Sequence, residues 1–242
     1  MGRRFAIGDI HGGLKALKEL LNQLQLKPED QLIFLGDYVD GWSESAAVIS
    51  FLIELQQTQD CIFIRGNHDD LVANWLKTGK AHEKWIKHGG ESTQLSYADK
   101  TSSLKELHLN FFDTLINYHV DQQNRLFLHA GFANLHGPEM EFYSNTVYWD
   151  RTLWEMVMAM DKELQPSHEH YPKRLKLFKE IYIGHTPTTR IGKTEPVNFA
   201  NVWNVDTGAA FKGPLTAINI DTKEVFQSKP VYLFYPNEKG RN

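Results

Sequence analysis

Residues 32–40 read LIFLGDYVD, four apolar residues followed by a glycine and then two aspartates three positions apart. A short, continuous apolar run is typical of a strand that is buried on both faces in an α/β sheet. Ligand sites in such sheets gather at the carboxyl ends of the strands. Asp37 therefore stands where a binding residue is expected, just past the end of a predicted strand.

The same arrangement recurs at four other places in the chain. Asp9 and His11 lie two residues apart, so at a strand end both side chains project to one face. Aspartate, histidine and asparagine are suitable ligands for Zn, Mn or Fe in sites of mixed nitrogen and oxygen donors. Two such ions close together are typical of phosphate ester hydrolysis, which is the chemistry that the pattern predicts. The other candidate ligands that directly follow a short apolar run are Asn67 after residues 62–64, His129 after residues 126–128 and His185 after residues 181–183.

These motifs resemble those of the metallophosphoesterase superfamily, and more narrowly its phosphoprotein phosphatase branch. That branch includes bacterial and phage serine/threonine phosphatases and the related diadenosine tetraphosphatases. The family signature GDxHG, GDxxDRG, GNHE/D, H-A/G-G and GHT is matched between residues 8 and 186 except directly after Asp40. Residues 204–208, NVDTG, resemble the closing strands of the family.

The resemblance implies an α/β fold of the metallophosphoesterase type. We expect a β-sandwich of two mixed sheets flanked by helices, with a helical cap insertion. Residues 1–242 would form a single calcineurin-like domain, and residues 70–120 and 132–180 would be the cap insertions. The aromatic residues of these insertions could shape the choice of substrate, although ordinary packing is the default interpretation.

The resemblance also implies roles for the motif residues. A hydroxide that bridges two divalent ions would attack phosphorus in line, because the metals lower its pKa. His68 would protonate the leaving oxygen, and Asp40 would hydrogen-bond His68 and orient it. Manganese is expected first as the cofactor, with iron, zinc or cobalt as alternatives. The implied ligands are Asp9, His11 and Asp37 for one ion, and Asp37, Asn67, His129 and His185 for the other.

The residues directly after Asp40 depart from the family pattern. The second motif of the family ends Asp-Arg-Gly, and its arginine clamps the phosphate, but here Gly41 and Trp42 follow Asp40. A guanidinium binds phosphoryl oxygens bidentately and stabilises the transition state, so positive charge has to come from elsewhere. Trp42 is interpreted as a wall of the pocket or as a surface on which a flat leaving group stacks.

Arginines elsewhere in the chain are candidates to replace the missing one. Arg151 is the first candidate, and Asn67 is a further expected contact of the substrate phosphate. Arg65 and Arg190 are weaker candidates. The alternative for Arg151 is an ordinary arginine at a helix start, paired with Asp150.

The function expected first is metal-dependent hydrolysis of phosphate monoesters, as in a serine/threonine phosphatase that acts on a phosphorylated protein or a small phosphoester. The alternative is hydrolysis of diadenosine polyphosphates or other nucleotide phosphoanhydrides. A binding protein without activity is ranked last, because such a protein usually loses a metal ligand or the proton donor. This chain keeps all of them.

Composition limits the partners and the compartment. The formal net charge of −4 argues against a nucleic-acid partner. Cys61 is the only cysteine, which excludes an internal disulfide and fits a reducing compartment. No apolar run approaches the roughly 20 residues of a membrane span, so we expect no membrane partner and a cytoplasmic protein.

Hydrophobic periodicity predicts the order of the elements. Strands are predicted near 4–8, 31–36, 61–65, 125–129, 181–184, 201–205, 214–220 and 223–229. Helices are predicted after residue 13, over 44–57 with Ser43 as N-cap, over 70–120 and over 152–162. Asp69 and Asp70 are expected to serve a helix start, and residues 88–91, HGGE, to shape a loop near the pocket mouth.

Overall fold

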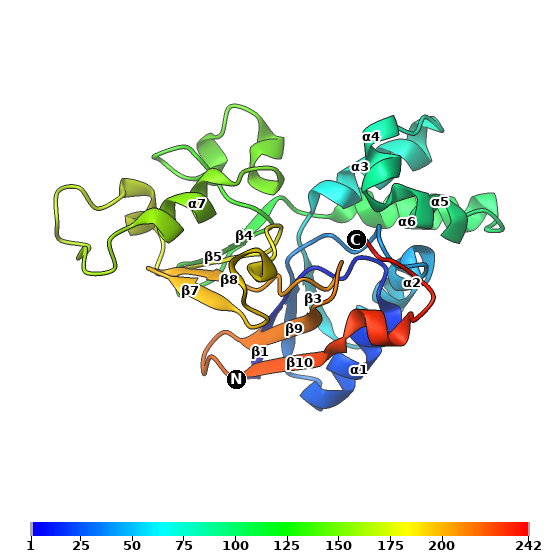
Figure 1. The fold of residues 1–242 in the computed structure, drawn as a ribbon, viewed down its shortest axis with the longest axis horizontal. Helices are drawn as coiled ribbons and strands as arrows, with labels where there is room; N and C mark the ends of the chain where they lie inside the picture. Colours follow the sequence, from blue (N-terminus) through cyan, green and yellow to red (C-terminus); the bar gives the residue numbers. More distant parts are fainter. Residues whose placement is uncertain (1, 242) are drawn as a thin grey trace.

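The computed structural model describes residues 2–241, so residues 1 and 242 of the expected domain lie outside the described part. Within residues 2–241, the strands form two five-stranded sheets, with the orders β10-β9-β1-β2-β3 and β4-β5-β6-β8-β7. Figure 1 shows the two sheets in the middle of the molecule with helices around them. The predicted α/β sandwich of two mixed sheets is confirmed.

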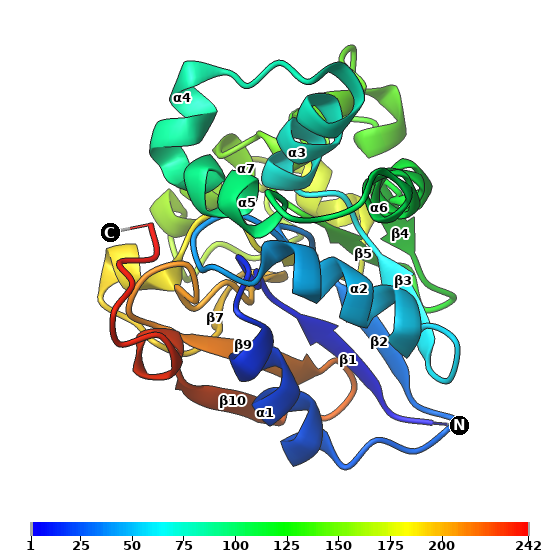
Figure 2. The ribbon, with the colours of Figure 1, turned by 90° about the vertical axis from the view of Figure 1, so that its right-hand side faces the viewer.

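The first sheet is built around three parallel strands, β1 (Arg4–Ile7), β2 (Gln31–Phe34) and β3 (Asp60–Phe63). Helices α1 (Leu14–Leu24) and α2 (Ser45–Leu55) connect them. Both helices lie across the outer face of this sheet (Figure 2). Apolar residues recur along α1 at helical spacing, which lets one face of the helix pack against the sheet.

Two further strands complete the first sheet. β9 (Pro214–Asn219) pairs antiparallel with β1, and β10 (Val225–Pro230) pairs antiparallel with β9. The turn between β9 and β10 contains residues 221–223, as predicted.

The second sheet, like the first, combines three parallel strands with two antiparallel ones. β5 (Arg125–Leu128), β6 (Glu180–Ile183) and β8 (Val202–Asn204) are parallel, and β4 (Tyr118–Val120) and β7 (Val197–Phe199) pair antiparallel at its two edges. The sequence did not predict β4 or β7, and the helical prediction for residues 118–120 is wrong. Strands of three residues are too short to show a period, and their pairing partners define them.

The inner faces of the two sheets pack against each other. Ala6, Ile33 and Ile218 of the first sheet share one buried apolar cluster with Phe127 and Tyr182 of the second. The rings of Phe127 and Tyr182 are stacked, with their centroids 4.9 Å apart. This buried apolar interface holds the strand ends of both sheets in one place, which positions the site described below.

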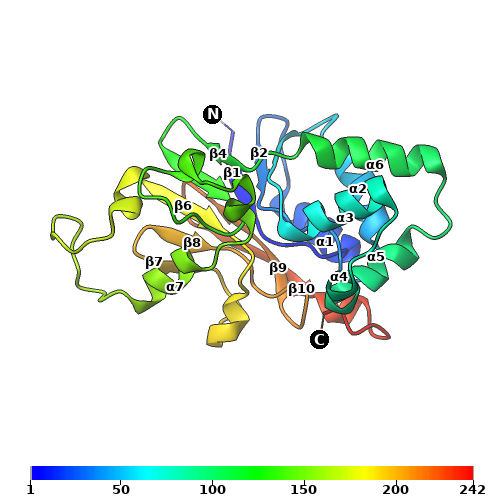
Figure 3. The same ribbon diagram turned by 90° about the horizontal axis from the view of Figure 1, so that it is seen from above.

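Helices cover the outer faces on both sides (Figure 3). α3 (Asn67–Thr78), α4 (Glu83–Trp85), α5 (Glu91–Ser96) and α6 (Ser102–Thr114) lie on the side of the first sheet. α7 (Thr152–Ala159) packs its buried side chains on the second sheet. Short helical turns complete the structure at Ile86–Gly90, Pro138–Met140, Ser144–Tyr148, Lys173–Leu177, Thr188–Ile191 and Val231–Phe234.

Two helix boundaries differ from the prediction. The N-cap of α2 is Glu44, because Ser43 instead donates from its backbone nitrogen and its hydroxyl to the carboxylate of Glu238. α7 ends at Ala159, three residues before the predicted end. Among residues 2–241, no helix is both long enough and apolar enough to cross a membrane.

Candidate metal centre and substrate pocket

Strands of both sheets end at the same edge of the sandwich, and polar residues follow each of them. β1, β2 and β3 lead to Asp9, Asp37 and Asn67, while β5 and β6 lead to His129 and His185. All five side chains are buried. The structure therefore brings together the residues that five separate motifs contribute.

Asp9, His11 and Asp37 form a first group, in which the possible ligand atoms lie within 4.8 Å of one another. Nε2 of His11 is 3.7 Å from Oδ2 of Asp9 and 3.5 Å from Oδ2 of Asp37. Nδ1 of His11 lies 3.1 Å from the carbonyl oxygens of Val39 and Asp40. Because Nδ1–H donates to these carbonyls, Nε2 is left to face the two carboxylates.

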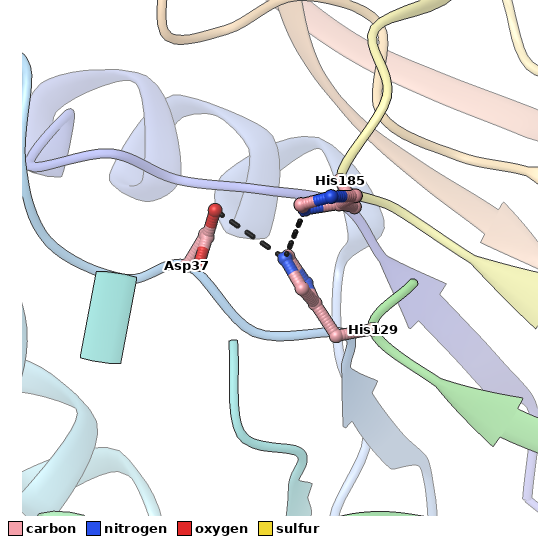
Figure 4. A group of neighbouring side chains, drawn as sticks. All are labelled: Asp37, His129 and His185. Carbon is pink, nitrogen blue, oxygen red and sulfur yellow. Dashed lines mark hydrogen bonds and ion pairs between the residues drawn. The ribbon is translucent and has the colours of Figure 1, made fainter. Parts of the chain in front are cut away.

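Asp37, His129 and His185 form a second group, shown in Figure 4. Nε2 of His129 lies 3.4 Å from Oδ2 of Asp37 and 3.2 Å from Nδ1 of His185. Oδ1 of Asn67 lies 2.9 Å from the same nitrogen of His185 and 3.2 Å from Nε2 of His129. Oδ2 of Asp37 faces both groups, so this carboxylate is shared by the two candidate ligand groups.

The hydrogen bonds of His129 test whether a cation fits here. Its Nδ1 lies 2.7 Å from the carbonyl oxygen of Leu35, so Nδ1–H donates to that carbonyl. The lone pair of Nε2 then faces Oδ1 of Asn67 at 3.2 Å. These two acceptor atoms repel each other unless they share a proton or a cation. Burial alone would lower the pKa of His129, but Asp37 beside it raises that pKa to about 10. The same attraction favours a divalent cation, and the nitrogen and oxygen donors suit one.

Buried carboxylates are crowded in this part of the molecule. Burial, together with the charge of Asp206, raises the pKa of Asp9 well above its usual range. Burial also raises the pKa of Asp206 to about 6, although the backbone N–H of Gly208 acts in the opposite direction. Burial would raise the pKa of Asp37 as well, but His129 and other nearby histidines hold it well below its usual range. Such a cluster of negative charge favours bound cations.

Asp206 was missed by the sequence analysis as a site residue. It is buried, follows β8 and lines the same pocket as His185. The sequence could have indicated Asp206, because residues 202–206 again place a carboxylate just past an apolar strand.

The backbone at the site is held in an unfavourable conformation. His11, Asp37, Asp40 and His185 have positive φ angles of 50°, 53°, 71° and 68°. For a residue other than glycine, the left-handed region costs roughly 1–2 kcal/mol. At Gly184 a Cβ atom would lie 2.1 Å from Oδ1 of Asp9, so only glycine allows this approach. Strain of this kind is concentrated at functional sites, because surrounding packing enforces it.

A buried pair, Asp40 and His68, lies next to the first group. Nδ1 of His68 is 2.6 Å from Oδ2 of Asp40, and the rings of His68 and His11 lie 5.1 Å apart. Asp40 also accepts hydrogen bonds from Nε1–H of Trp85 and from the hydroxyl of Thr93, each at 2.6 Å. Trp85 and Thr93 were missed, because no local spacing links them to Asp40.

A cavity of about 420 Å³ opens onto these residues. Its walls include the guanidinium side chains of Arg151, Arg190 and Arg241 and the aromatic side chains of Trp149 and Phe211. Burial lowers the pKa of Arg151, and the charges of Arg190 and Arg241 lower it further. The guanidinium group of Arg151 is therefore close enough to those of Arg190 and Arg241 to be repelled by them.

Comparison with known proteins agrees with this geometry. The family described as calcineurin-like phosphoesterase matches residues 3–209. The chain belongs to the calcineurin-like phosphoesterase family. It is 28% identical to bis(5'-nucleosyl)-tetraphosphatase PrpE [asymmetrical] of Oceanobacillus iheyensis, over 90% of this chain and 88% of the relative. It is 27% identical to the protein of the same name from Bacillus thuringiensis, over 97% of each chain.

Solved structures share the fold of this calcineurin-like phosphoesterase. A structure assigned provisionally as a diadenosine tetraphosphatase matches with a TM-score of 0.63 and 16% identity, over 93% of this chain and 92% of that one. A protein serine/threonine phosphatase from Saccharomyces cerevisiae matches with a TM-score of 0.57 and 14% identity, over 95% and 83%. The family and the buried Asp and His groups together make this chain a metal-dependent phosphoesterase.

Three other residues singled out in the sequence, Arg65, Asp69 and Asp70, make structural contacts outside the pocket. Arg65 does not line the pocket, because its guanidinium donates to the carbonyl oxygen of Phe112 at 2.9 Å and pairs with Asp70 at 3.7 Å. The carboxylate of Asp69 accepts backbone N–H groups at Asp37 and Gly66, each at 2.8 Å, so it fixes the loops that carry the ligands. Both aspartates thus have structural contacts, as predicted.

The interpretation of Trp42 as a pocket wall is wrong. Trp42 is fully buried beneath the site, where its ring nitrogen donates to the carbonyl oxygen of Ala209 at 2.7 Å. Residues 88–91 lie at the pocket, as predicted, because His88 lines it and the Gly89 carbonyl accepts from the backbone of Gly41 at 3.2 Å. They do not form a loop, however, since they belong to the helical turn Ile86–Gly90 and to the start of α5. Asp150 does not pair with Arg151, since its carboxylate caps the start of α7.

Proposed function

We propose that this phosphoesterase hydrolyses dinucleoside tetraphosphates, including diadenosine tetraphosphate. Relatives that match nearly the whole chain are named asymmetrical bis(5'-nucleosyl)-tetraphosphatases, which supports the alternative drawn from the sequence over the phosphomonoesterase expected first. Water would break one P–O–P bond and release products of unequal length. Diadenosine tetraphosphate would give ATP and AMP.

The distribution of charge in the pocket is the observation that carries this proposal. Arg151, Arg190 and Arg241 line the same cavity as Asp37 and His185 of the metal groups. Three guanidinium groups beside a metal centre supply more positive charge than one phosphoryl group needs, and they suit a chain of phosphates. The net charge of the whole protein is −4, so the positive charge is local to the pocket.

Two aromatic side chains add surfaces suited to a nucleoside. Trp149 is 42% exposed, and Phe211 lines the cavity together with it. Bases stack on aromatic side chains, whereas a small phosphomonoester offers nothing comparable to these surfaces. We assign Trp149 and Phe211 to binding of a nucleoside part of the substrate.

Two divalent ions, manganese first, belong to the proposal as cofactors. When bound, they would polarise the phosphoryl group and make water a stronger nucleophile. Arg151 would hold a substrate phosphate, and Asn67 would contact it from the ligand cluster. The proposed ligands are Asp9, His11 and Asp37 for one ion, and Asp37, Asn67, His129 and His185 for the other.

His68 and Asp40 are proposed to act on the leaving group. His68 lines the pocket and would give its proton to the departing phosphate oxygen. Asp40 would hold His68 in place through the 2.6 Å contact with Nδ1. Trp85 and Thr93 would keep the Asp40 carboxylate oriented by their hydrogen bonds to it.

Residues 70–120 and 132–180 are proposed as caps on a single domain. Each segment contributes side chains to the pocket, Trp85 and His88 from the first and Trp149 and Arg151 from the second. These contributions place substrate-facing residues outside the two sheets. The caps would thus set the choice of substrate, while the strand ends set the chemistry.

The test compares phosphate ester cleavage by the manganese-loaded protein on diadenosine tetraphosphate, a phosphopeptide and an aryl phosphomonoester, with products separated by chromatography. We expect the highest kcat/KM for the dinucleotide, with ATP and AMP as products. Preference for the phosphopeptide or the aryl ester would overturn the proposal in favour of a phosphomonoesterase. No cleavage of any substrate, with metal bound, would favour a binding protein.

A matched pair of variants examines the charge argument. Arg151→Ala should raise KM for diadenosine tetraphosphate by about tenfold or more, because a charged hydrogen-bond partner is lost. Lys212→Ala removes one positive charge from an exposed side chain that does not line the pocket and should change KM less than twofold. An equal change of KM in the two variants would contradict the proposed contact between Arg151 and a substrate phosphate.

A further inference from the structure

The side chain of Arg241 reaches the pocket from a part of the sequence that contains none of the ligand motifs. Arg241 lines the cavity that also holds His11 and His68. A Cβ atom built on Gly41 would lie 3.2 Å from Cγ of Arg241, and one built on Gly89 would lie 3.1 Å from it. Arg241 therefore passes over the residue that follows Asp40, in the space that a side chain at position 41 would need.

Several contacts hold the segment that carries Arg241, residues 235–241, against the rest of the molecule. The rings of Trp42 and Tyr235 are stacked, with centroids 5.3 Å apart and planes inclined by 20°. Glu238 accepts hydrogen bonds from the backbone and hydroxyl of Ser43 at 2.9 and 2.7 Å. This segment is drawn red in Figure 3. We call residues 235–241 the terminal strap.

The last residues of the terminal strap are placed by Trp42 as well. A Cβ atom on Gly240 would lie 2.8 Å from Cζ2 of Trp42, so the backbone of the strap lies directly on the ring. The backbone nitrogen of Arg241 donates to the carbonyl oxygen of Ala210 at 2.9 Å. Ala209, the preceding residue, accepts the hydrogen bond from the Trp42 ring. Trp42 thus connects the loop after Asp40 to the strap that brings Arg241 over it.

Packing fixes the position of the Arg241 guanidinium group, but no negatively charged side chain among residues 2–241 pairs with it. Its Nε is buried and has no hydrogen-bond partner among residues 2–241. Within the same described residues, no carboxylate forms an ion pair with it, and its only ring contact is with Phe211, at 5.6 Å. Its charge acts on His11, on Asp206 and on Arg151, so it lies near both the metal groups and another arginine of the pocket. A buried donor without an acceptor points to an anion that completes the site.

We propose that Arg241 binds a phosphoryl group of the substrate and supplies the guanidinium that the sequence lacks after Asp40. Gly41 favours this arrangement, because a Cβ atom there would crowd Cγ of Arg241 and the positive φ of this residue suits glycine. Trp42 makes it specific, because it anchors the terminal strap. The ligand is a phosphate ester or anhydride held at the metal centre. This inference rests on the proposed function only in requiring that a phosphoryl group is bound next to the two ions.

The test measures binding of inorganic phosphate to the manganese-loaded full chain by titration calorimetry, so that it does not depend on which ester is the substrate. Arg241→Ala should weaken phosphate binding by about tenfold to a hundredfold, because one charge-assisted, bidentate contact is lost. Arg241→Lys should recover part of the affinity, since lysine keeps the charge but not the fork. Lys212→Ala should bind phosphate as the wild type does.

Metal content and melting temperature, measured on the same samples, separate loss of the contact from loss of the fold. Equal phosphate affinity of the wild type and Arg241→Ala would overturn the proposal, and so would a wild type that binds no phosphate when loaded with metal. An Arg241→Lys protein as weak as Arg241→Ala, with metal content unchanged, would contradict the expected contribution of the positive charge. Failure to cleave diadenosine tetraphosphate would refute the proposed function alone, because the phosphate titration would still stand.

Discussion

Nδ1 of His68 lies 2.6 Å from Oδ2 of Asp40, and both side chains are buried beside the metal groups. A carboxylate in this position fixes the imidazole ring and leaves Nε2 directed away from it. Nε2 is therefore the nitrogen available to a substrate in the pocket. This arrangement makes the first prediction specific.

Replacing His68 by asparagine should lower kcat by roughly 100- to 10,000-fold, the range typical of losing a general acid. Metal content should stay unchanged, because His68 belongs to neither group of candidate ligands. Steady-state kinetics on the preferred substrate and elemental analysis of the same sample check both parts. A variant that keeps its activity would show that another group donates the proton.

The indole of Trp85 should act as a positioning group for Asp40. Trp85→Phe keeps the ring but removes the Nε1–H that donates to Asp40 at 2.6 Å, so we expect kcat to fall about tenfold with KM little changed. Trp75→Phe is the matched control, because Trp75 packs against Trp85 with ring centroids 5.6 Å apart, and among residues 2–241 it is not a hydrogen-bond donor to Asp40. Equal loss in both variants would point to packing instead of the hydrogen bond.

Asp37 should be needed for both metal ions, because its carboxylate belongs to both groups of candidate ligands. We expect Asp37→Asn to lose both ions and Asp9→Asn to lose one, with metal affinity lowered by at least about 100-fold. Elemental analysis of metal per chain after gel filtration measures this. Asp70→Asn is the control and should keep both ions, since Asp70 lies outside these groups. Two ions retained by Asp37→Asn would contradict the shared position.

His108 should make stability depend on pH. It is fully buried, with Nδ1 at 2.7 Å from the hydroxyl of Tyr97 and Nε2 at 3.0 Å from the hydroxyl of Ser50, and burial lowers its pKa to about 4. An unfolded histidine has a pKa of about 6.5, so the unfolded chain binds the proton more readily. Stability is then lost as the pH falls from about 6.5 towards 4, by about 2 kcal/mol between pH 7 and pH 5.

Urea unfolding of the metal-free protein at pH 7 and pH 5 measures this effect. His108→Gln should remove that part of the loss, whatever its constant cost in hydrogen bonds. His136→Gln changes an exposed histidine and should follow the wild type. The assignment would fail if the difference between the two pH values were the same in all three proteins.

Much of the site could be predicted because each ligand is encoded locally. Asp9, Asp37 and His185 each follow a short apolar run, and Gly184 is required where the backbone passes Asp9. These are short-range effects of strand formation and sterics, so the letters in one window are enough to indicate them. The long, periodic helices were found for the same reason, whereas the three-residue strands β4 and β7 were not.

The choice between substrates was less well predicted. The missing arginine after Asp40 indicated a change in phosphate binding. Arg65, one candidate to replace it, instead donates a hydrogen bond to the carbonyl oxygen of Phe112 in α6. Trp42 was interpreted as a surface for substrate because its position in the motif is close to the site. Its side chain points the other way, into the core, which the motif does not specify.

The sequence by itself determined the family, the set of candidate ligands and the strand that precedes each of them, because these depend on residues close together in the chain. Only the tertiary structure decided that Trp85 and Thr93 hold Asp40, and that Arg241 lies over Gly41. No spacing rule connects residue 41 with residue 241. Their contact depends on how two sheets dock and where the terminal strap packs, and long-range packing of that kind leaves no local pattern in the sequence.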